Sequence, residues 1–297
     1  RHTMEPSKDY ILYHKGCCFA GKITTPEYID SLETFEIRDS DVFLVTFPKS
    51  GTVWTQNILS LIIHEGHRNG TENIENMDRM PWLEYNVKNM DYTALPSPRV
   101  FPTHLPYYLT PRDLRNKKAR VIYVTRNPKD VLVSYFYFSK IISALEEVPD
   151  FNLFMERFLA GNGKICFLLR TPNPIVLFQS EWRLIIAINI NYPDSSDLQS
   201  AVLKICNFLG RKLSEKEVES VVRQATFENM KKDPRANYEK LSENLQVDTE
   251  GHFLRKGTIG DWKNTMTVAQ SERVDEVLKK KLKNLPIKFI WDMHDEV

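Results

Sequence analysis

Cysteine is scarce in this chain: there are only four, irregularly spaced and without a Cys-x-x-Cys pair. The sequence therefore predicts neither a disulfide framework nor a structural zinc site, and we expect no bound metal and a reducing, cytosolic compartment. No run of about eighteen apolar residues occurs, as a membrane-spanning helix would require, and the polar start RHTMEPSKDY lacks the apolar core of a signal peptide. We expect a soluble cytoplasmic protein with no membrane partner.

An excess of charge of either sign is also missing. Forty Lys and Arg residues face 39 Asp and Glu residues, which leaves a net charge near zero. No global field would attract nucleic acid or an anionic membrane, so nucleic acid is not an expected partner. Any site that binds an anion must be built locally from a few residues.

Internal repeats and low-complexity linkers are absent, and β-branched runs instead alternate with amphipathic stretches. This rhythm is typical of a single α/β domain with a central parallel sheet and helices on both faces. The strands are expected at 41–47 and 119–125, and the helices at 53–66, 128–140, 198–209 and 215–223. We assign residues 1–297 to this domain, with 1–30 as an N-terminal extension. The polar part after about residue 231 is expected to be irregular, and its segment 231–275 is expected to be rich in loops, to cover the ligand and to form contacts between two copies.

The segment FPKSGTVWT, at 47–55, lies where the first of these strands should turn into a helix. Such a junction offers free backbone N–H groups and the positive end of a helix dipole. Small Ser50, Gly51 and Thr52 let an anion approach this backbone, and Lys49 adds a positive charge. The order G-x-x-x-x-G-K-[ST] of nucleoside triphosphatases is absent. Alone, this segment would more often be an ordinary surface turn.

Two further basic turns favour a functional site. TRNPKDVLVS, at 125–134, again follows a strand and carries Arg126 and Ser134, which suit a phosphate group. FLRKGTIGDW, at 253–262, places Arg255 and Lys256 beside Gly257. Three separated basic turns predict a ligand with several anionic groups, although each alone could be a solvated charged turn.

PKSGTVW, TRNPKDVLVSYFYF and RKGTIGDWKN together resemble signature regions of the cytosolic sulfotransferases. These enzymes transfer a sulfuryl group from 3′-phosphoadenosine 5′-phosphosulfate (PAPS). The resemblance covers most of 30–275, except 162–190, and is strongest to the amine sulfotransferase branch. It implies the sulfotransferase fold with a phosphosulfate-binding loop, and a role in xenobiotic metabolism. The implied acceptor is a small apolar amine, with a phenol, alcohol or steroid as the alternative.

The resemblance also implies roles for individual residues. Lys49 would stabilise charge on the leaving phosphate, and Ser134 would assist the reaction while binding the nucleotide. The 5′-phosphosulfate would be held by the 48–53 loop, that is by Lys49, Ser50, Gly51, Thr52 and Val53. The 3′-phosphate would be held by Arg126, Ser134, Arg255, Lys256 and Gly257. The adenine would lie between Trp54 and Phe227 and receive a hydrogen bond from Tyr192.

His104, in the family-like context THLP, is the expected general base, because an imidazole titrates near neutral pH without special tuning. The acceptor pocket is expected to involve residues 81–92 and the aromatic residues that follow His104. Within that stretch Trp82 is apolar, and Glu84 could pair with an ammonium group or be merely structural.

The chain also departs from the family pattern. Pro102 stands where most members have a lysine two residues before the histidine, and Ala225 stands where many have a threonine or serine. The stretch 162–190 also differs from the family, either by ordinary divergence or because it is an alternative splice or gene-model product. A catalytically weak PAPS-binding member and a P-loop kinase remain alternatives. KNTMTVAQSE, at 263–272, fits the family's dimer pattern, in which Lys263 would face the partner's Glu272, so we expect a homodimer.

Overall fold

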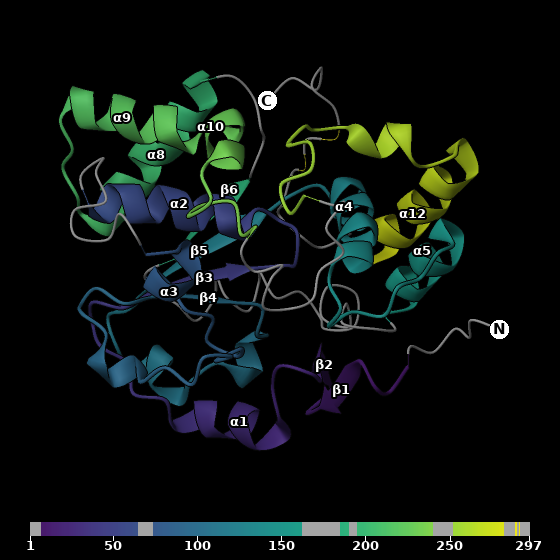
Figure 1. Cartoon of the computed structure of the whole chain (residues 1–297), viewed down its shortest axis with the longest axis horizontal. Helices are drawn as coiled ribbons and strands as arrows, with labels where there is room; N and C mark the ends of the chain where they lie inside the picture. Colours follow the sequence, from purple (N-terminus) through teal and green to yellow (C-terminus); the bar gives the residue numbers. More distant parts are fainter. Residues whose placement is uncertain are drawn as a thin grey trace.

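The computed structural model describes residues 7–64, 74–161, 185–189, 195–239, 252–281, 289 and 291. Four parallel strands form its central sheet in the order β4-β3-β5-β6 (Figure 1). They are β3 (Val42–Thr46), β4 (Val100–Thr103), β5 (Arg120–Thr125) and β6 (Ile185–Asn189). Val42 pairs with both Val100 and Arg120, so the carboxyl ends of the inner strands meet at one edge.

Alternate side chains of β3 and β5 pack into two different hydrophobic cores on the two faces of the sheet. Leu44 and Ile122 pack toward α2 (Thr52–Ile63), α8 (Ser195–Leu209) and α9 (Glu215–Ala225). Phe43 and Val121 point to the opposite face, which α1 (Pro26–Ser31) covers together with short 3₁₀ turns. These turns are η1 (Leu32–Thr34), η2 (Tyr92–Ala94), η3 (Tyr107–Leu109) and η4 (Arg112–Arg115). The predicted two-sided cover is present, but on this face the helices are short.

A third core lies beyond the carboxyl end of β3. Phe47 packs there with α4 (Pro128–Ile141), α5 (Phe151–Ala160) and α12 (Val268–Lys281), which lie together in Figure 1. The prediction of an irregular end after residue 231 is wrong in this part. Val274 and Leu278, four residues apart, bury one stripe of α12 although the rest of the helix is polar.

The expected strands and helices near 41–66, 119–140 and 195–225 are confirmed within a few residues. Residues 1–30, expected as a plain extension, include a hairpin of β1 (Ile11–His14) and β2 (Cys17–Ala20). The shorter elements are α3 (Asn76–Arg79), α10 (Phe227–Lys232) and η5 (Asp261–Asn264). Among the described helices, none has both the length and the apolar character needed to cross a membrane.

Candidate functional site: a nucleotide and acceptor pocket

The junction between β3 and α2 forms the predicted anion loop. The backbone φ is 67° at Lys49 and 97° at Gly51, so two left-handed residues flank Ser50. Gly51 is the N-cap of α2 and has no side chain to bond the first amides of the helix. These amides are therefore available to an anion at the positive end of the helix dipole. Thr52 lines the pocket, whereas Ser50 is buried and is not among its lining residues.

Lys49 extends from this loop into the pocket. Its Nζ lies 4.1 Å from the ring centroids of both Phe138 and Phe253, an arrangement that attracts a cation to the ring faces. Burial, together with the positive charges of Arg126 and Arg255, lowers the pKa of Lys49 to about 7. A polyanion bound among these groups would favour the charged ammonium. Sequence reasoning missed both aromatic rings, because nothing in the spacing of 49, 138 and 253 links them.

The three basic turns meet in this pocket, as predicted. It is lined by Arg126, Ser134, Arg255, Lys256 and Gly257, as well as by Lys49. Arg126 lies between two of the turns, because its Nη1 donates to the carbonyl of Lys49 and its Nη2 to that of Thr258, both at 3.3 Å. Positive groups from three widely separated segments of the sequence therefore share one cavity.

Trp54 and Phe227 line the same pocket. The indole Nε1 of Trp54 donates to the carbonyl of Ala225 at 2.8 Å, which fixes the plane of the ring. Gly257, with a φ of 66°, approaches Phe227 so closely that a Cβ atom at 257 would lie 2.2 Å from the Phe227 ring. Only glycine fits there. Tyr192, the predicted adenine partner, lies outside the described residues. Of the stretch 162–190, only residues 185–189, which form β6, are described.

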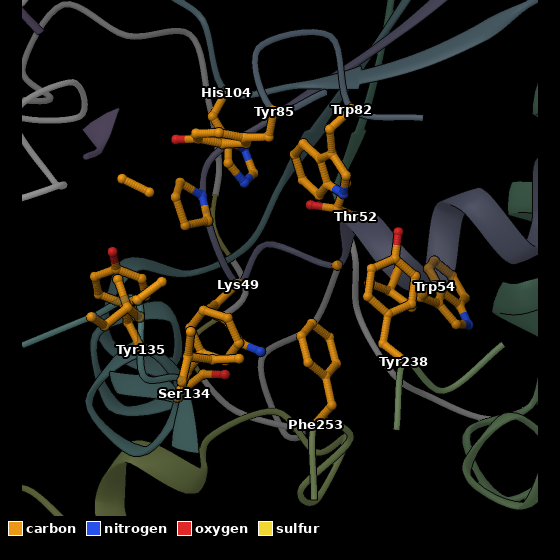
Figure 2. A pocket seen from close by; sticks show the side chains of 18 of the residues that line it. Lys49, Thr52, Trp54, Trp82, Tyr85, His104, Ser134, Tyr135, Tyr238 and Phe253 are labelled. Atoms are coloured by element: carbon orange, nitrogen blue, oxygen red, sulfur yellow. The ribbon is translucent and has the colours of Figure 1, made fainter. Parts of the chain in front are cut away.

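His104 follows β4 and lines the pocket on the side opposite Ser134. In Figure 2, His104, Tyr85 and Trp82 lie on one side, Ser134 and Phe253 on the other, and Lys49 between them. The Nδ1–H of His104 donates to the backbone carbonyl of Thr46 at 2.8 Å, because a carbonyl can only accept. The Nε2 atom of the neutral ring therefore keeps its lone pair and can accept a proton.

The electrostatics of His104 differ from the prediction. Burial and the positive charge of Lys49 lower the pKa of His104 to about 4, although the hydrogen bond to Thr46 acts to raise it. The expectation of an imidazole with an untuned, near-neutral pKa was wrong for this reason. The ring stays neutral at physiological pH, and it is held against Trp82 with 4.6 Å between ring centroids.

Glu84 is the one carboxylate that lines the pocket in the described part of the chain. It is only 1% exposed. Its Oε1 accepts the backbone N–H of His104 at 2.7 Å, whereas its Oε2 has no hydrogen-bond partner among the described atoms. Burial raises the pKa of Glu84 to about 7, although the hydrogen bond from the backbone N–H of His104 opposes the rise. A buried, half-satisfied carboxylate is costly unless a ligand completes its bonding.

The rest of this side is apolar. The β1–β2 hairpin supplies Cys17, Phe19 and Ala20, and the segment after α4 supplies Ile142 and Leu145. Sequence reasoning treated 1–30 as an extension and missed its contribution to the pocket. Within the described residues, no cluster of three His, Cys, Asp or Glu side chains could hold a metal ion.

An α/β sheet with an anion-binding loop at its carboxyl edge, four converging cations and an opposed histidine defines a group-transfer enzyme with a polyanionic cosubstrate. Comparison with known proteins narrows this class. The pattern of the "Sulfotransferase domain" family matches residues 39–286. The chain is 49% identical to an amine sulfotransferase of Oryctolagus cuniculus over an alignment of 298 positions, which covers 99% of this chain and 97% of that protein. It is 37% identical to sulfotransferase 2B1 of Mus musculus, covering 97% and 84% of the two chains.

Solved structures agree. A mouse sulfotransferase complexed with PAP matches with a TM-score of 0.71 and 26% identity, over 93% of this chain and 96% of that chain. Retinol dehydratase in complex with retinol and PAP matches with a TM-score of 0.76 at 23% identity, over 89% and 88%, and shows the fold alone. The protein belongs to the sulfotransferase family and is an enzyme of sulfuryl transfer. The predicted family is confirmed, and the kinase alternative is removed.

Proposed function

We propose that the protein transfers a sulfuryl group from PAPS to the nitrogen of a small apolar amine. The observation that carries this proposal is the pocket itself, which is lined by His104 and Glu84 together with four cations, Lys49, Arg126, Arg255 and Lys256. Lys49 lies between His104 on one side and Ser134 on the other (Figure 2). When bound, PAPS supplies an activated sulfuryl group whose leaving group is a phosphate.

The donor set fits PAPS, which carries a 5′-phosphosulfate, a 3′-phosphate and an adenine. Lys49, Gly51 and Thr52 suit the 5′ group, because an ammonium and open helix amides converge there. The 3′-phosphate would be held by Arg126, Ser134, Arg255, Lys256 and Gly257. Trp54 and Phe227 present aromatic surface to the adenine.

The reaction requires a base and a cation on opposite sides of the sulfuryl group. His104 Nε2 carries the free lone pair and would accept the proton that the acceptor loses as it attacks. Lys49 would neutralise charge that develops on the leaving phosphate, where an electrostatic contact stabilises the transition state most. Ser134 would orient the nucleotide by donating a hydrogen bond.

Glu84 supports the choice of an amine. An N–H group of an amine entering the apolar side of the pocket would give the unpartnered Oε2 atom its missing hydrogen bond and leave the nitrogen lone pair for attack. Trp82 lies beside His104 and would cover the apolar part of the acceptor. Pro102 stands where the family resemblance would place a lysine, so that position adds no positive charge to repel a protonated amine as it enters. The rabbit relative is also named for amines.

We test this proposal by assaying small aromatic and alicyclic amines, phenols and hydroxysteroids with PAPS as the common donor. Amines should be turned over first, and Glu84→Gln should lower kcat/KM for amines roughly 10- to 100-fold, the worth of a charge-assisted hydrogen bond. Turnover of neutral phenols should change much less. Glu33→Gln, which alters an exposed carboxylate paired with Arg112, is the matched control.

Strong turnover of phenols with none of amines would overturn the choice of acceptor. Binding of PAP without transfer to any acceptor would instead indicate a catalytically weak member. We further propose that the protein is cytoplasmic, that it acts in the metabolism of foreign amines, and that it forms a homodimer through residues 263–272.

A further inference from the structure

Two of the proposed phosphate-binding side chains share one buried carboxylate. Asp261 is 4% exposed; its Oδ2 accepts from Arg255 Nη2 at 2.5 Å, and its Oδ1 accepts from Lys256 Nζ at 2.8 Å and from Asn264 Nδ2 at 3.0 Å. Burial would raise the pKa of Asp261, but the hydrogen bonds from Lys256, Asn264 and Arg255 outweigh it and lower the pKa to about 2. The carboxylate is therefore ionised wherever the enzyme works.

A second buried carboxylate holds the backbone on both sides of Asp261. Asp130, in the first turn of α4, is 1% exposed. Its two oxygens accept the backbone N–H groups of Gly260 at 2.9 Å and Trp262 at 3.0 Å. Asn127, the N-cap of α4, donates to the same carboxylate at 2.7 Å. The turn that carries Arg126 is thus tied directly to the loop that carries Arg255 and Lys256.

These contacts leave the binding faces of the cations available. Arg255 lies over the ring of Tyr137 on α4, 4.6 Å from its centroid, and bonds Asp261 through Nη2. A guanidinium has five N–H donors in one plane, so the other edge remains able to meet a phosphate. Arg255 is 28% exposed and Lys256 is 50% exposed, whereas Asp261 lies behind them.

We propose that Asp130 and Asp261 act in series as positioning residues that give the enzyme its preference for a nucleotide with a 3′-phosphate. Asp130 fixes the backbone at 260 and 262, this backbone fixes Asp261, and Asp261 holds Arg255 and Lys256 in place before the nucleotide arrives. The inference rests on the proposed function, in which these cations bind the 3′-phosphate. A rival view makes the opposite prediction: Asp261 is a negative charge near a phosphate, and its removal would tighten binding.

The test compares the Kd of adenosine 3′,5′-bisphosphate with that of adenosine 5′-monophosphate by calorimetry. The ratio of the two values reports the 3′-phosphate alone, since both ligands carry the 5′-phosphate and the adenine. Asp261→Asn should reduce this preference about tenfold or more and leave the affinity for the monophosphate nearly unchanged. Asp130→Asn should act in the same direction. Because the residues act in series, the double variant should lose no more of the 3′-phosphate preference than the more impaired of the two single variants.

Lys129→Met is the matched control. Lys129 is the neighbour of Asp130, but its Nζ bonds Ser271 and Asp275 on α12. It also lies 4.4 Å from the centroid of the Trp262 ring, so it touches the loop without bonding its backbone, Arg255, Lys256 or Asp261. This variant should lower Tm while leaving the nucleotide preference intact. If Asp261→Asn does not fold, Asp130→Asn alone decides the matter: an unchanged preference in a folded Asp130→Asn protein would overturn the proposal.

Arg255→Ala separates this inference from the function on which it rests. A large loss of the 3′-phosphate preference in Arg255→Ala supports the proposed nucleotide site. If Asp261→Asn then keeps the preference or binds the bisphosphate more tightly, the positioning role is wrong and the nucleotide site stands. If Arg255→Ala itself keeps the preference, the proposed 3′-phosphate site is wrong.

Discussion

Lys49 is the residue whose chemistry depends most on its neighbours. Burial and the adjacent arginines lower its pKa to about 7, so near neutral pH about half of these side chains have lost their proton. A phosphosulfate or phosphate at the α2 N-terminus would raise this pKa again, because an adjacent anion favours the ammonium. Nucleotide binding should therefore be coupled to proton uptake by Lys49.

We expect nucleotide affinity to fall as pH rises above 7, by up to about tenfold per pH unit. The sign follows from the bound state, which holds more protons than the free state between the free and bound pKa values of Lys49. The phosphates themselves are mostly ionised there, since their second pKa is about 6. Calorimetry in buffers of different ionisation enthalpy measures the uptake. Lys49→Met should bind more weakly and show no such uptake; equal uptake in this variant would assign the proton to another group.

His104 should matter for turnover and little for nucleotide binding. His104→Ala is expected to lower kcat by about 10²- to 10⁴-fold, the usual worth of a general base, with the Kd for PAP nearly unchanged. Because burial lowers the pKa of His104 to about 4, its protonation should not reduce wild-type kcat until the pH falls below about 5. High pH should partly restore the variant with phenols that ionise unaided. Wild-type turnover in His104→Ala would make this residue structural.

At the scale of elements, two strand-turn-helix units build the cationic side of the pocket. β3 with α2 and β5 with α4 were predicted from their apolar runs and basic turns, and both are present. Parallel pairing of β3 with β5 brings the two turns to the same edge. Local sequence was sufficient here, because the strand pattern and the turn chemistry agree within each unit.

The elements that were missed have weaker local patterns. The turn of the β1–β2 hairpin is Lys15-Gly16, and both residues have positive φ, 47° and 77°. Such a turn usually carries Asn or Asp at its first position, so Lys15 gave no sequence signal for the hairpin. β4 is only four residues long and includes Pro102, which is tolerated because β4 pairs with β3 alone in the described sheet.

At the scale of the whole molecule, the proposed homodimer remains a prediction. Residues 263–272 run from the end of η5 into the start of α12, and Val268, the first residue of α12, is 77% exposed. An exposed valine between Lys263 and Glu272 suits a small two-fold interface in which each lysine meets the partner's glutamate.

Val268→Glu should weaken such a dimer at least about tenfold, since it buries an unpaired charge at the interface. Sedimentation velocity over a concentration series measures the shift toward monomer, and nucleotide affinity should not change. Leu203→Glu, which alters another exposed apolar residue on α8, is the control and should leave the association unchanged. A wild-type protein that stays monomeric at every concentration would contradict the proposal.

The local sequence was enough to predict the α/β architecture, the anion loop and the basic turns, since each depends on residues only a few positions apart. The aromatic contacts of Lys49, the lowered pKa of His104, the unpartnered oxygen of Glu84 and the sharing of Asp261 by Arg255 and Lys256 emerged only from the folded chain. Contacts and burial of this kind depend on how distant segments pack, and desolvation is a property of the packed site that no single segment encodes.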